Sequence, residues 1–470
     1  MKLPDSYPAT ALVNLGHLRH NLRHLRACAP DSQPLAIIKA DAYGHGSLPV
    51  ALTVLEEGVN WLGQAQIGEA LHLRKELDKA GVPSCLDPEG PRLFTWIVNA
   101  DPAGKGPKQL SKAIMRGLDI SASNLAELEA ILAAGKRARE KAQTEKTSAK
   151  TKLPKTGQSE MLPPRQAYLA AGCPPPRVHL KIDVGNSRAG SPAAVWPELV
   201  AQAARAESAG QLQVVGIWSH LQSADEATPE GIERTNQQIA RFEQAVQVAQ
   251  SVGLENKILH LSATSGGLWH PRAHFDLIRW GIGLYGLSPD PTHPRTPDFL
   301  RPVMELSAPL LSVKRVPAGE GVSYNATWTT PGDRWLGLVP LGYADGINRR
   351  ASNRAKVWAR LETGELKEFP VVGRICMDQF VIDLGPADQP APLARGQRIY
   401  LFGSGEPDGL PSVDKWAQAI DTINYEVVTT LGPRVPRVYW EPANRSTTET
   451  MRCLTETGLN PENGVESSGK

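Results

Sequence analysis

Short apolar runs alternate with amphipathic stretches over the first 290 residues. The runs that this pattern predicts as strands are residues 35–38, 61–67, 94–98, 118–121, 178–184, 214–220, 258–262 and 277–284. Between them apolar residues recur at helical spacing, as with Leu18, Leu22 and Leu25. Helices are predicted at residues 18–27, 48–57, 69–79, 110–116, 125–134, 195–209 and 231–251. Strands and helices that alternate in this way are typical of parallel βαβ units, and eight units predict a (β/α)8 barrel.

The pattern changes after residue 289, where proline, glycine and β-branched residues become frequent. Short strands are predicted at residues 311–316, 336–341, 356–360, 371–374, 380–383 and 398–402, and a helix at 412–420. We therefore expect an α/β barrel at residues 10–290 and a mainly β domain at 291–444, with residues 1–9 packed on that second domain. The polar residues 445–470 are expected to form a flexible tail.

Residues 137–164 differ from their surroundings. They are rich in lysine, threonine, alanine and proline and show almost no apolar periodicity. This composition predicts a disordered, solvated insertion in the barrel. A nucleic-acid-binding tail is the alternative, but acidic residues dilute its positive charge.

Composition narrows the function classes. The chain has 51 basic and 49 acidic residues, a net charge of +2, and so gives no indication of a nucleic-acid partner. Neither a secretory signal nor an apolar stretch of membrane-spanning length is present, so no membrane partner is expected. The five cysteines are scattered without CxxC spacing, which argues against disulfides and a metal site and favours a reducing cytoplasm.

Lys39 is the first candidate for chemistry. It follows directly on the apolar run at 35–38. A lysine at the carboxyl end of a buried strand has a desolvated amine with a lowered pKa, and such an amine can attack a carbonyl group to form a Schiff base. The alternative is an ordinary surface lysine at a strand end.

Other polar residues also stand at predicted strand ends, where a parallel barrel gathers its functional groups. They are Lys181, Arg188, His220, Ser265 and Arg279. Each has a structural alternative, since His220 could be a core histidine and Arg279 a paired surface group. Their coincidence at one end of one barrel favours a site.

The string AIIKADAYGHG at 36–46 resembles the lysine motif of the alanine racemases, which use pyridoxal 5'-phosphate (PLP). Further similar strings are KIDVGNSR, LIRWGIGLYG, GYADGINR, VGRICMDQF and TINYEVV. The resemblance implies that Lys39 forms the Schiff base with PLP. It implies a phosphate-binding set of Tyr43, Ser265, Gly281, Ile282 and Tyr425.

The same resemblance assigns the remaining polar groups. Arg188 would contact the phenolic oxygen of PLP and the substrate carboxylate, and Lys181 matches a lysine that is often carbamylated and braces that arginine. Arg279 would donate a hydrogen bond to the pyridine nitrogen, which keeps that nitrogen unprotonated. His220 would connect Arg279 to a catalytic tyrosine.

That tyrosine is Tyr324, in GEGVSYNATW, which the neighbouring subunit supplies in the family. Tyr324 would exchange the proton on the L side of the substrate Cα, and Lys39 the proton on the D side. Met377 would lie near the substrate and Tyr343 at the entrance. A homodimer with shared active sites is therefore implied.

The resemblance implies a cytoplasmic alanine racemase that supplies D-alanine for peptidoglycan. Alternatives on the same scaffold are a racemase of serine, lysine or several amino acids, a barrel-type PLP decarboxylase, and a non-catalytic PLP-binding protein. The chain has DVGNSR where the family usually has D-T-G-M-G-R, Asp41 for a usual Asn, and Thr264 for a common Asn. Substrate preference, a biosynthetic or catabolic role, and carbamylation of Lys181 stay open.

Overall fold

A computed structural model describes residues 8–101, 103–148, 164–403 and 409–441. These described residues divide into two compact units, one within residues 18–301 and the other within residues 8–17 and 302–441. The predicted flexible tail at 445–470 and most of residues 1–9 lie outside the described residues. Among the described residues, no helix combines the length and apolarity that a membrane crossing requires.

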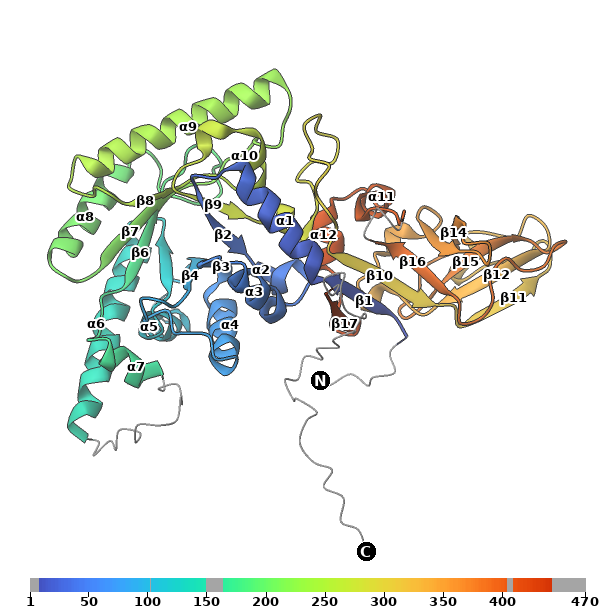
Figure 1. The fold of residues 1–470 in the computed structure, drawn as a ribbon, viewed down its shortest axis with the longest axis horizontal. Coiled ribbons are helices and arrows are strands. Elements are labelled where there is room, and N and C mark those ends of the chain that lie inside the picture. Colours follow the sequence, from blue (N-terminus) through green and yellow to red (C-terminus); the bar gives the residue numbers. More distant parts are fainter. Residues whose placement is uncertain (1–7, 102, 149–163, 404–408, 442–470) are drawn as a thin grey trace, which may run out of the picture. The chain divides into compact units, whose positions relative to one another are not determined.

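The first unit is an eight-stranded parallel barrel, in agreement with the predicted fold class (Figure 1). Its strands are β2 (Gln33–Ile37), β3 (Trp61–Gln66), β4 (Arg92–Ile97), β5 (Asp119–Ala122), β6 (Arg177–Lys181), β7 (Gln213–Trp218), β8 (Ile258–His260) and β9 (Leu277–Trp280). The sheet runs in chain order from β8 back to β2, and β9 pairs with β2. Across the last gap the Arg279 N–H donates to the Ser262 carbonyl at 3.1 Å, so the barrel is nearly closed.

Helices follow the barrel strands along the chain, and each longer helix buries apolar side chains on one face. They are α2 (Lys39–Tyr43), α3 (Ser47–Glu56), α4 (Ile67–Lys79), α5 (Gly106–Met115), α6 (Leu125–Ser148), α7 (Pro164–Ala170), α8 (Trp196–Ser208), α9 (Pro229–Gln250) and α10 (Thr264–Trp269). Helix α1 (Leu15–Cys28) precedes them and buries Leu18, Leu22 and Leu25. These three leucines form the face that their spacing predicts.

Helix α6 corrects the prediction of a disordered insertion at residues 137–164. The helix continues to Ser148 instead of ending near residue 134, and α7 begins at Pro164. Ala134, Ala138 and Ala142 are fully buried, so alanines four residues apart form a narrow apolar stripe. Alanine is only weakly hydrophobic, so among the surrounding charged residues these alanines gave too little apolar periodicity to predict a helix. Residues 149–163 lie outside the described residues.

The second unit is mainly β, as predicted. Its nine-stranded sheet has the order β11-β12-β15-β14-β13-β16-β10-β1-β17. The strands are β1 (Thr10–Asn14), β10 (Met304–Pro309), β11 (Ser312–Val316), β12 (Arg334–Val339), β13 (Lys356–Arg360), β14 (Leu366–Val372), β15 (Phe380–Pro386), β16 (Arg398–Phe402) and β17 (Arg437–Trp440). Two helices, α11 (Val413–Ala419) and α12 (Asn424–Thr429), lie between β16 and β17.

Strand β1 belongs to this second sheet, although residues 10–17 were predicted as the start of the barrel. β1 pairs antiparallel with β10 and parallel with β17, which contains residues from the far end of the chain. Ala11 and Val13 are fully buried. An apolar alternation identifies a strand but not its partners, so local pattern could not assign β1 to one sheet or the other.

A buried ion-pair cluster joins three barrel strands at their amino ends. Asp119 on β5 is fully buried and accepts from Arg92 on β4 at 2.9 Å and from Arg177 on β6 at 2.6 Å. Burial raises the pKa of the Asp119 carboxyl, but the two arginines more than offset this effect and hold the pKa below its ordinary value. Groups at this end of a barrel contribute to stability rather than to chemistry.

Replacing Asp119 with asparagine should destabilise the barrel by about 3 kcal/mol, because two partly buried guanidinium groups lose their counter-charge. The matched control is Asp421→Asn, since Asp421 also bonds two arginines but is solvent-exposed and should change stability by about 1 kcal/mol at most. Urea denaturation at pH 7 measures both. The Asp119 contribution should decline only as the pH falls below about 4, and equal losses in the two variants would contradict this account.

Candidate active site

Lys39 lies directly beyond strand β2, at the start of a turn with unusual backbone geometry. The four residues after it, Ala40–Tyr43, all have φ between 51° and 54°, in the left-handed region. None is glycine, and each such residue costs about 1 kcal/mol. Ala40 N–H donates to Glu69 at 3.1 Å and Ser47 N–H to Asp41 at 2.7 Å, which help to hold the turn. Backbone strain of this kind concentrates at functional sites.

The amine of Lys39 lies in a basic environment. Burial lowers the pKa of Lys39, Arg188 and Arg279 lower it further, and Glu69 opposes them. A lowered pKa leaves more of the amine neutral at pH 7 and free to attack a carbonyl carbon. The lowered pKa agrees with the desolvated amine that a lysine at the end of a buried strand predicts.

Arg279 on β9 is buried and held almost entirely by neutral acceptors. Its guanidinium donates to the carbonyl oxygens of Ser219 (2.8 Å), Leu261 (2.8 Å) and His260 (3.0 Å). Burial lowers the pKa of Arg279 to about 9, so it remains a cation at neutral pH. The carbonyls fix the side chain without neutralising its charge, which leaves it suited to an anionic or electron-rich partner.

His220 bonds to this arginine and so has a defined tautomer. Its Nδ1 lies 3.3 Å from an Arg279 nitrogen. Arginine can only donate, so Nδ1 is the acceptor and the proton of the neutral ring is on Nε2. Burial lowers the pKa of His220 well below its ordinary value, and nearby cations add to this effect: Arg279, Arg188, Lys181 and Lys39. The neutral ring can accept from Arg279 and donate onward from Nε2.

Lys181, at the end of β6, lies over an aromatic ring. Its Nζ is 4.3 Å from the centroid of Trp218, and the guanidinium carbon of Arg279 is 5.0 Å from the same ring. Burial lowers the pKa of Lys181 to about 8, with further lowering by Arg279 and Arg188. An amine with that pKa is partly neutral at physiological pH.

Arg188 is exposed in the loop after β6. The Asp183 carboxylate organises this loop by accepting from the N–H groups of Gly185, Asn186 and Ser187 at 2.9–3.1 Å. Ser187 has a φ of 54°, at the position where glycine is usual in the resembling motif. The carboxylate bonds hold the loop in this conformation despite the substitution.

Tyr43 and Gly281 lie together at the ends of β2 and β9. A Cβ atom at Gly281 would come within 2.7 Å of the Tyr43 hydroxyl, so any other residue there would displace Tyr43. Thr264, at the start of α10, accepts from the N–H groups of Gly281 (3.1 Å) and Gly283 (3.3 Å) through its hydroxyl. Ser265 follows Thr264, and Ile282 follows Gly281 as the first residue of a 3₁₀ turn.

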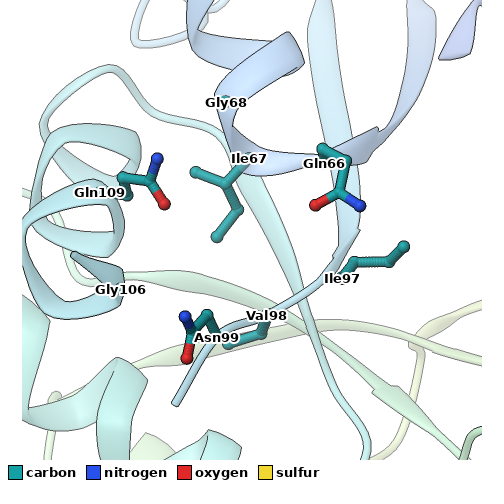
Figure 2. A pocket seen from close by; sticks show the side chains of 8 residues that line it. All are labelled: Gln66, Ile67, Gly68, Ile97, Val98, Asn99, Gly106 and Gln109. Carbon is teal, nitrogen blue, oxygen red and sulfur yellow. The ribbon is translucent and has the colours of Figure 1, made fainter. Parts of the chain in front are cut away.

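A cavity of about 410 Å³ also opens at the carboxyl ends of the barrel strands (Figure 2). Figure 2 shows the amides of Gln66, Asn99 and Gln109 around the side chain of Ile67, between the first turns of α4 and α5. None of its lining residues is ionisable, and it contains none of the predicted site residues. It therefore differs in chemistry from the basic site at Lys39.

Three more predicted residues have exposed side chains on the second unit. Tyr324, Met377 and Tyr343 are 66%, 53% and 45% exposed. Tyr343 N–H donates to the Cys376 carbonyl at 3.1 Å, which places it beside Met377. Tyr425 lies on α12 of the same unit. Tyr343 and Met377 are exposed next to each other, and neighbouring exposed apolar side chains indicate a contact surface.

Two residues that contact the predicted site residues were not predicted from the sequence. Trp218, which underlies Lys181 and Arg279, and His260, which accepts from Arg279, were not singled out. Trp218 is the last residue of β7 and His220 lies two residues beyond it, so a continued strand alternation could have indicated Trp218. Thr264 was noted only as a departure from the family pattern. Its bonds to glycine N–H groups depend on the folded loop.

The two family models that match the chain cover both units. The model "Alanine racemase, N-terminal domain" matches residues 13–145 and 160–289, and "Alanine racemase, C-terminal domain" matches residues 303–439. The alanine racemase of Streptomyces coelicolor is 42% identical over 433 residues, which are 92% of this chain and 95% of that protein. That of Beutenbergia cavernae is 40% identical, covering 92% and 98%.

Solved structures agree with these matches. The crystal structure of alanine racemase from the D-cycloserine producer Streptomyces lavendulae is similar with a TM-score of 0.76 at 36% identity, over 93% of this chain and 98% of that one. The Streptomyces coelicolor alanine racemase structure gives 0.76 at 40% identity, over 92% and 98%. The barrel and the second, mainly β unit together match the architecture of a class of isomerases, the racemases. The chain belongs to the alanine racemase family.

Proposed function

We propose that this protein interconverts L-alanine and D-alanine with PLP, at active sites shared between the two subunits of a homodimer. The observation that supports this proposal most strongly is the lowered pKa of Lys39 beside Arg188 and Arg279. A neutral amine suits an aldehyde, and the surrounding cations suit a phosphate and a phenolate oxygen. PLP combines all three groups in one molecule.

Different residues of the site would bind different parts of the cofactor. Lys39 would bind its aldehyde carbon, Arg188 its phenolic oxygen, and Arg279 its ring nitrogen. The phosphate would bind the hydroxyls and backbone groups of Tyr43, Ser265, Gly281, Ile282 and Tyr425. The absence of a side chain at Gly281 supports this, because it lets the Tyr43 hydroxyl lie next to the Gly281 backbone, so that two of the proposed phosphate contacts are neighbours. When bound, PLP supplies the electron sink that makes the substrate Cα proton acidic.

Proton transfer would use one base on each face of the substrate. Lys39 Nζ exchanges the Cα proton on the D side, and the hydroxyl of Tyr324 from the partner subunit exchanges it on the L side. His220 donates from Nε2 to the tyrosine oxygen, since its Nδ1 is occupied by Arg279. Arg279 thereby stabilises the negative charge that develops on the tyrosine oxygen.

Lys181 is proposed to carry a carbamate that braces Arg188. The ammonium group first loses a proton; the neutral amine then forms an N–C bond with CO2 and releases a second proton, so the group changes from a cation to an anion. The lowering of the Lys181 pKa to about 8 supports this step. Carbamylation can be tested by ¹³C NMR in labelled bicarbonate. We expect a carbamate signal from the wild-type protein and none from Lys181→Arg. The same signal in both proteins would exclude Lys181.

Alanine is the substrate that the relatives indicate, because the two similar proteins from Streptomyces coelicolor and Beutenbergia cavernae are alanine racemases. Tyr343 and Met377 would leave space for little more than a methyl group. One extra methylene is typically discriminated by about 1–3 kcal/mol in such a pocket. The D-alanine would supply peptidoglycan precursors in the cytoplasm.

The deciding experiment measures racemisation of a panel of amino acids by the PLP-loaded protein. We expect kcat/KM for alanine to exceed that for serine and lysine by about tenfold or more. A preference for serine or lysine would support the alternative racemases. Release of CO2 without racemisation would support a decarboxylase, and PLP binding without turnover a non-catalytic protein.

Arg279→Glu should slow racemisation and increase the transamination by-product pyruvate. A carboxylic acid can protonate the ring nitrogen, whereas arginine only donates a hydrogen bond to it, and protonation makes the ring a stronger electron sink. The ratio of pyruvate to D-alanine formed from L-alanine measures the effect. Arg279→Lys keeps the cation and should not raise this ratio. An unchanged ratio in Arg279→Glu would show that Arg279 does not contact that nitrogen.

A further inference from the structure

Ser323, the residue before Tyr324, has a backbone conformation almost reserved for glycine. Its φ is 61° and its ψ is −168°. Side chains are strongly disfavoured there, and the conformation persists only where surrounding contacts enforce it. Asn325, on the other side of Tyr324, also has a positive φ of 62°. Tyr324 thus lies in a turn whose backbone conformation is unfavourable for the residues on either side of it.

A hydrogen bond from its side chain holds Ser323 in this conformation. The Ser323 hydroxyl donates to the Arg374 carbonyl at 2.6 Å and lies 3.3 Å from the Cys376 sulfur. Gly373, with a φ of 70°, packs against the same turn: a Cβ there would come within 2.5 Å of the Val322 carbonyl. The turn is therefore clamped against residues 373–376.

The same segment also positions Tyr343 and Met377. Tyr343 N–H donates to the Cys376 carbonyl at 3.1 Å, and Ala344 N–H donates to the Met377 carbonyl at 3.0 Å. Tyr343 and Met377 are the residues proposed to define the substrate space. The Ser323 hydroxyl consequently links the proposed base to the backbone that carries those residues.

We propose that Ser323 is a positioning residue, whose hydroxyl bond to the Arg374 carbonyl holds Tyr324 in place for proton transfer on the L face of the substrate. This inference rests on the proposed function of Tyr324. Without the bond, the turn is no longer tied to the Arg374 carbonyl, so the phenol oxygen is no longer held in one position. Displacement of a reacting group by about 1 Å can cost about 100-fold in rate.

The test separates the two faces of the substrate by isotope exchange. In D2O, return of D-alanine with deuterium at Cα needs Lys39 alone, whereas loss of the L-alanine Cα proton needs Tyr324. Ser323→Ala should slow proton loss from L-alanine, and racemisation in both directions, by about 10- to 100-fold. Deuterium exchange into D-alanine should stay within about twofold of the wild-type rate.

Two further variants distinguish positioning from general damage. Ser352→Ala removes another serine hydroxyl that bonds the same segment, where it accepts from Ile375 N–H at 2.9 Å and donates to the Arg349 carbonyl. It should leave exchange on both faces unchanged. Ser323→Gly removes the hydroxyl but tolerates the backbone conformation, so it should fold and still lose L-face exchange.

The exchange rates of these variants either support or contradict the positioning role of Ser323. Wild-type L-face exchange in Ser323→Gly, or equal losses on both faces in Ser323→Ala, would overturn the inference. An equal L-face loss in Ser352→Ala would also overturn it. Tyr324→Phe tests the underlying proposal separately: if it retains L-face exchange, Tyr324 is not the base. If Tyr324→Phe loses that exchange and Ser323→Ala does not, only the role of Ser323 fails.

Discussion

Replacing Lys39 with alanine should reduce racemisation to background, a fall of about 10⁴-fold or more, and remove the visible absorbance of lysine-bound PLP. Lys39 is proposed to act both as the attachment point of the cofactor and as the base on the D face, so one substitution removes two functions. The only other lysine described in the same basic cluster is Lys181, which lies over Trp218 at the end of β6. It is too closely packed there to replace Lys39.

Borohydride reduction followed by peptide mapping identifies the attachment point. Wild-type protein should be labelled on Lys39, and Lys39→Ala should not be labelled. Lys257→Ala is the matched control, because Lys257 bonds Glu207 at 2.9 Å just before β8 and should affect stability only. Stable labelling of another lysine in Lys39→Ala, together with retained turnover, would refute the assignment.

The barrel and the position of Lys39 could be predicted because both depend on local pattern. A short apolar run that ends in a lysine indicates a strand with that lysine at its carboxyl end. The left-handed turn at Ala40–Tyr43 could not be predicted, since none of its four residues is glycine and none signals a positive φ. Tertiary contacts such as the bond from Ala40 to Glu69 hold it instead.

The contribution of the second unit was much harder to read from residues alone. Nothing near Tyr324 marks a base, and only the family resemblance selected it. The role proposed for Ser323 depends on a carbonyl 51 residues further along the chain. Strand β1 likewise depends on β10 and β17, both far away in sequence. Long-range pairing of this kind leaves no periodic signal.

Mixing two inactive variants should restore about a quarter of wild-type activity if each site takes Lys39 from one subunit and Tyr324 from the other. Lys39→Ala and Tyr324→Phe are each expected to be inactive alone. In their heterodimer one site receives both defects and the other receives neither. Random exchange makes about half of the dimers mixed, with one good site of two, which gives the quarter. A tyrosine acting in its own chain predicts no recovery.

A second mixture makes the opposite comparison with the same two substitutions. Wild-type chains are mixed in equal amounts with chains that carry both Lys39→Ala and Tyr324→Phe. Shared sites leave every mixed dimer inactive, so only the wild-type homodimers, about a quarter of the total, contribute. Sites within one chain leave one good site in each mixed dimer, and about half of full activity remains. Native mass spectrometry confirms the mixed dimers in both experiments. Recovery in the first mixture with a quarter remaining in the second requires the shared site, because misfolding or incomplete exchange would not produce both values.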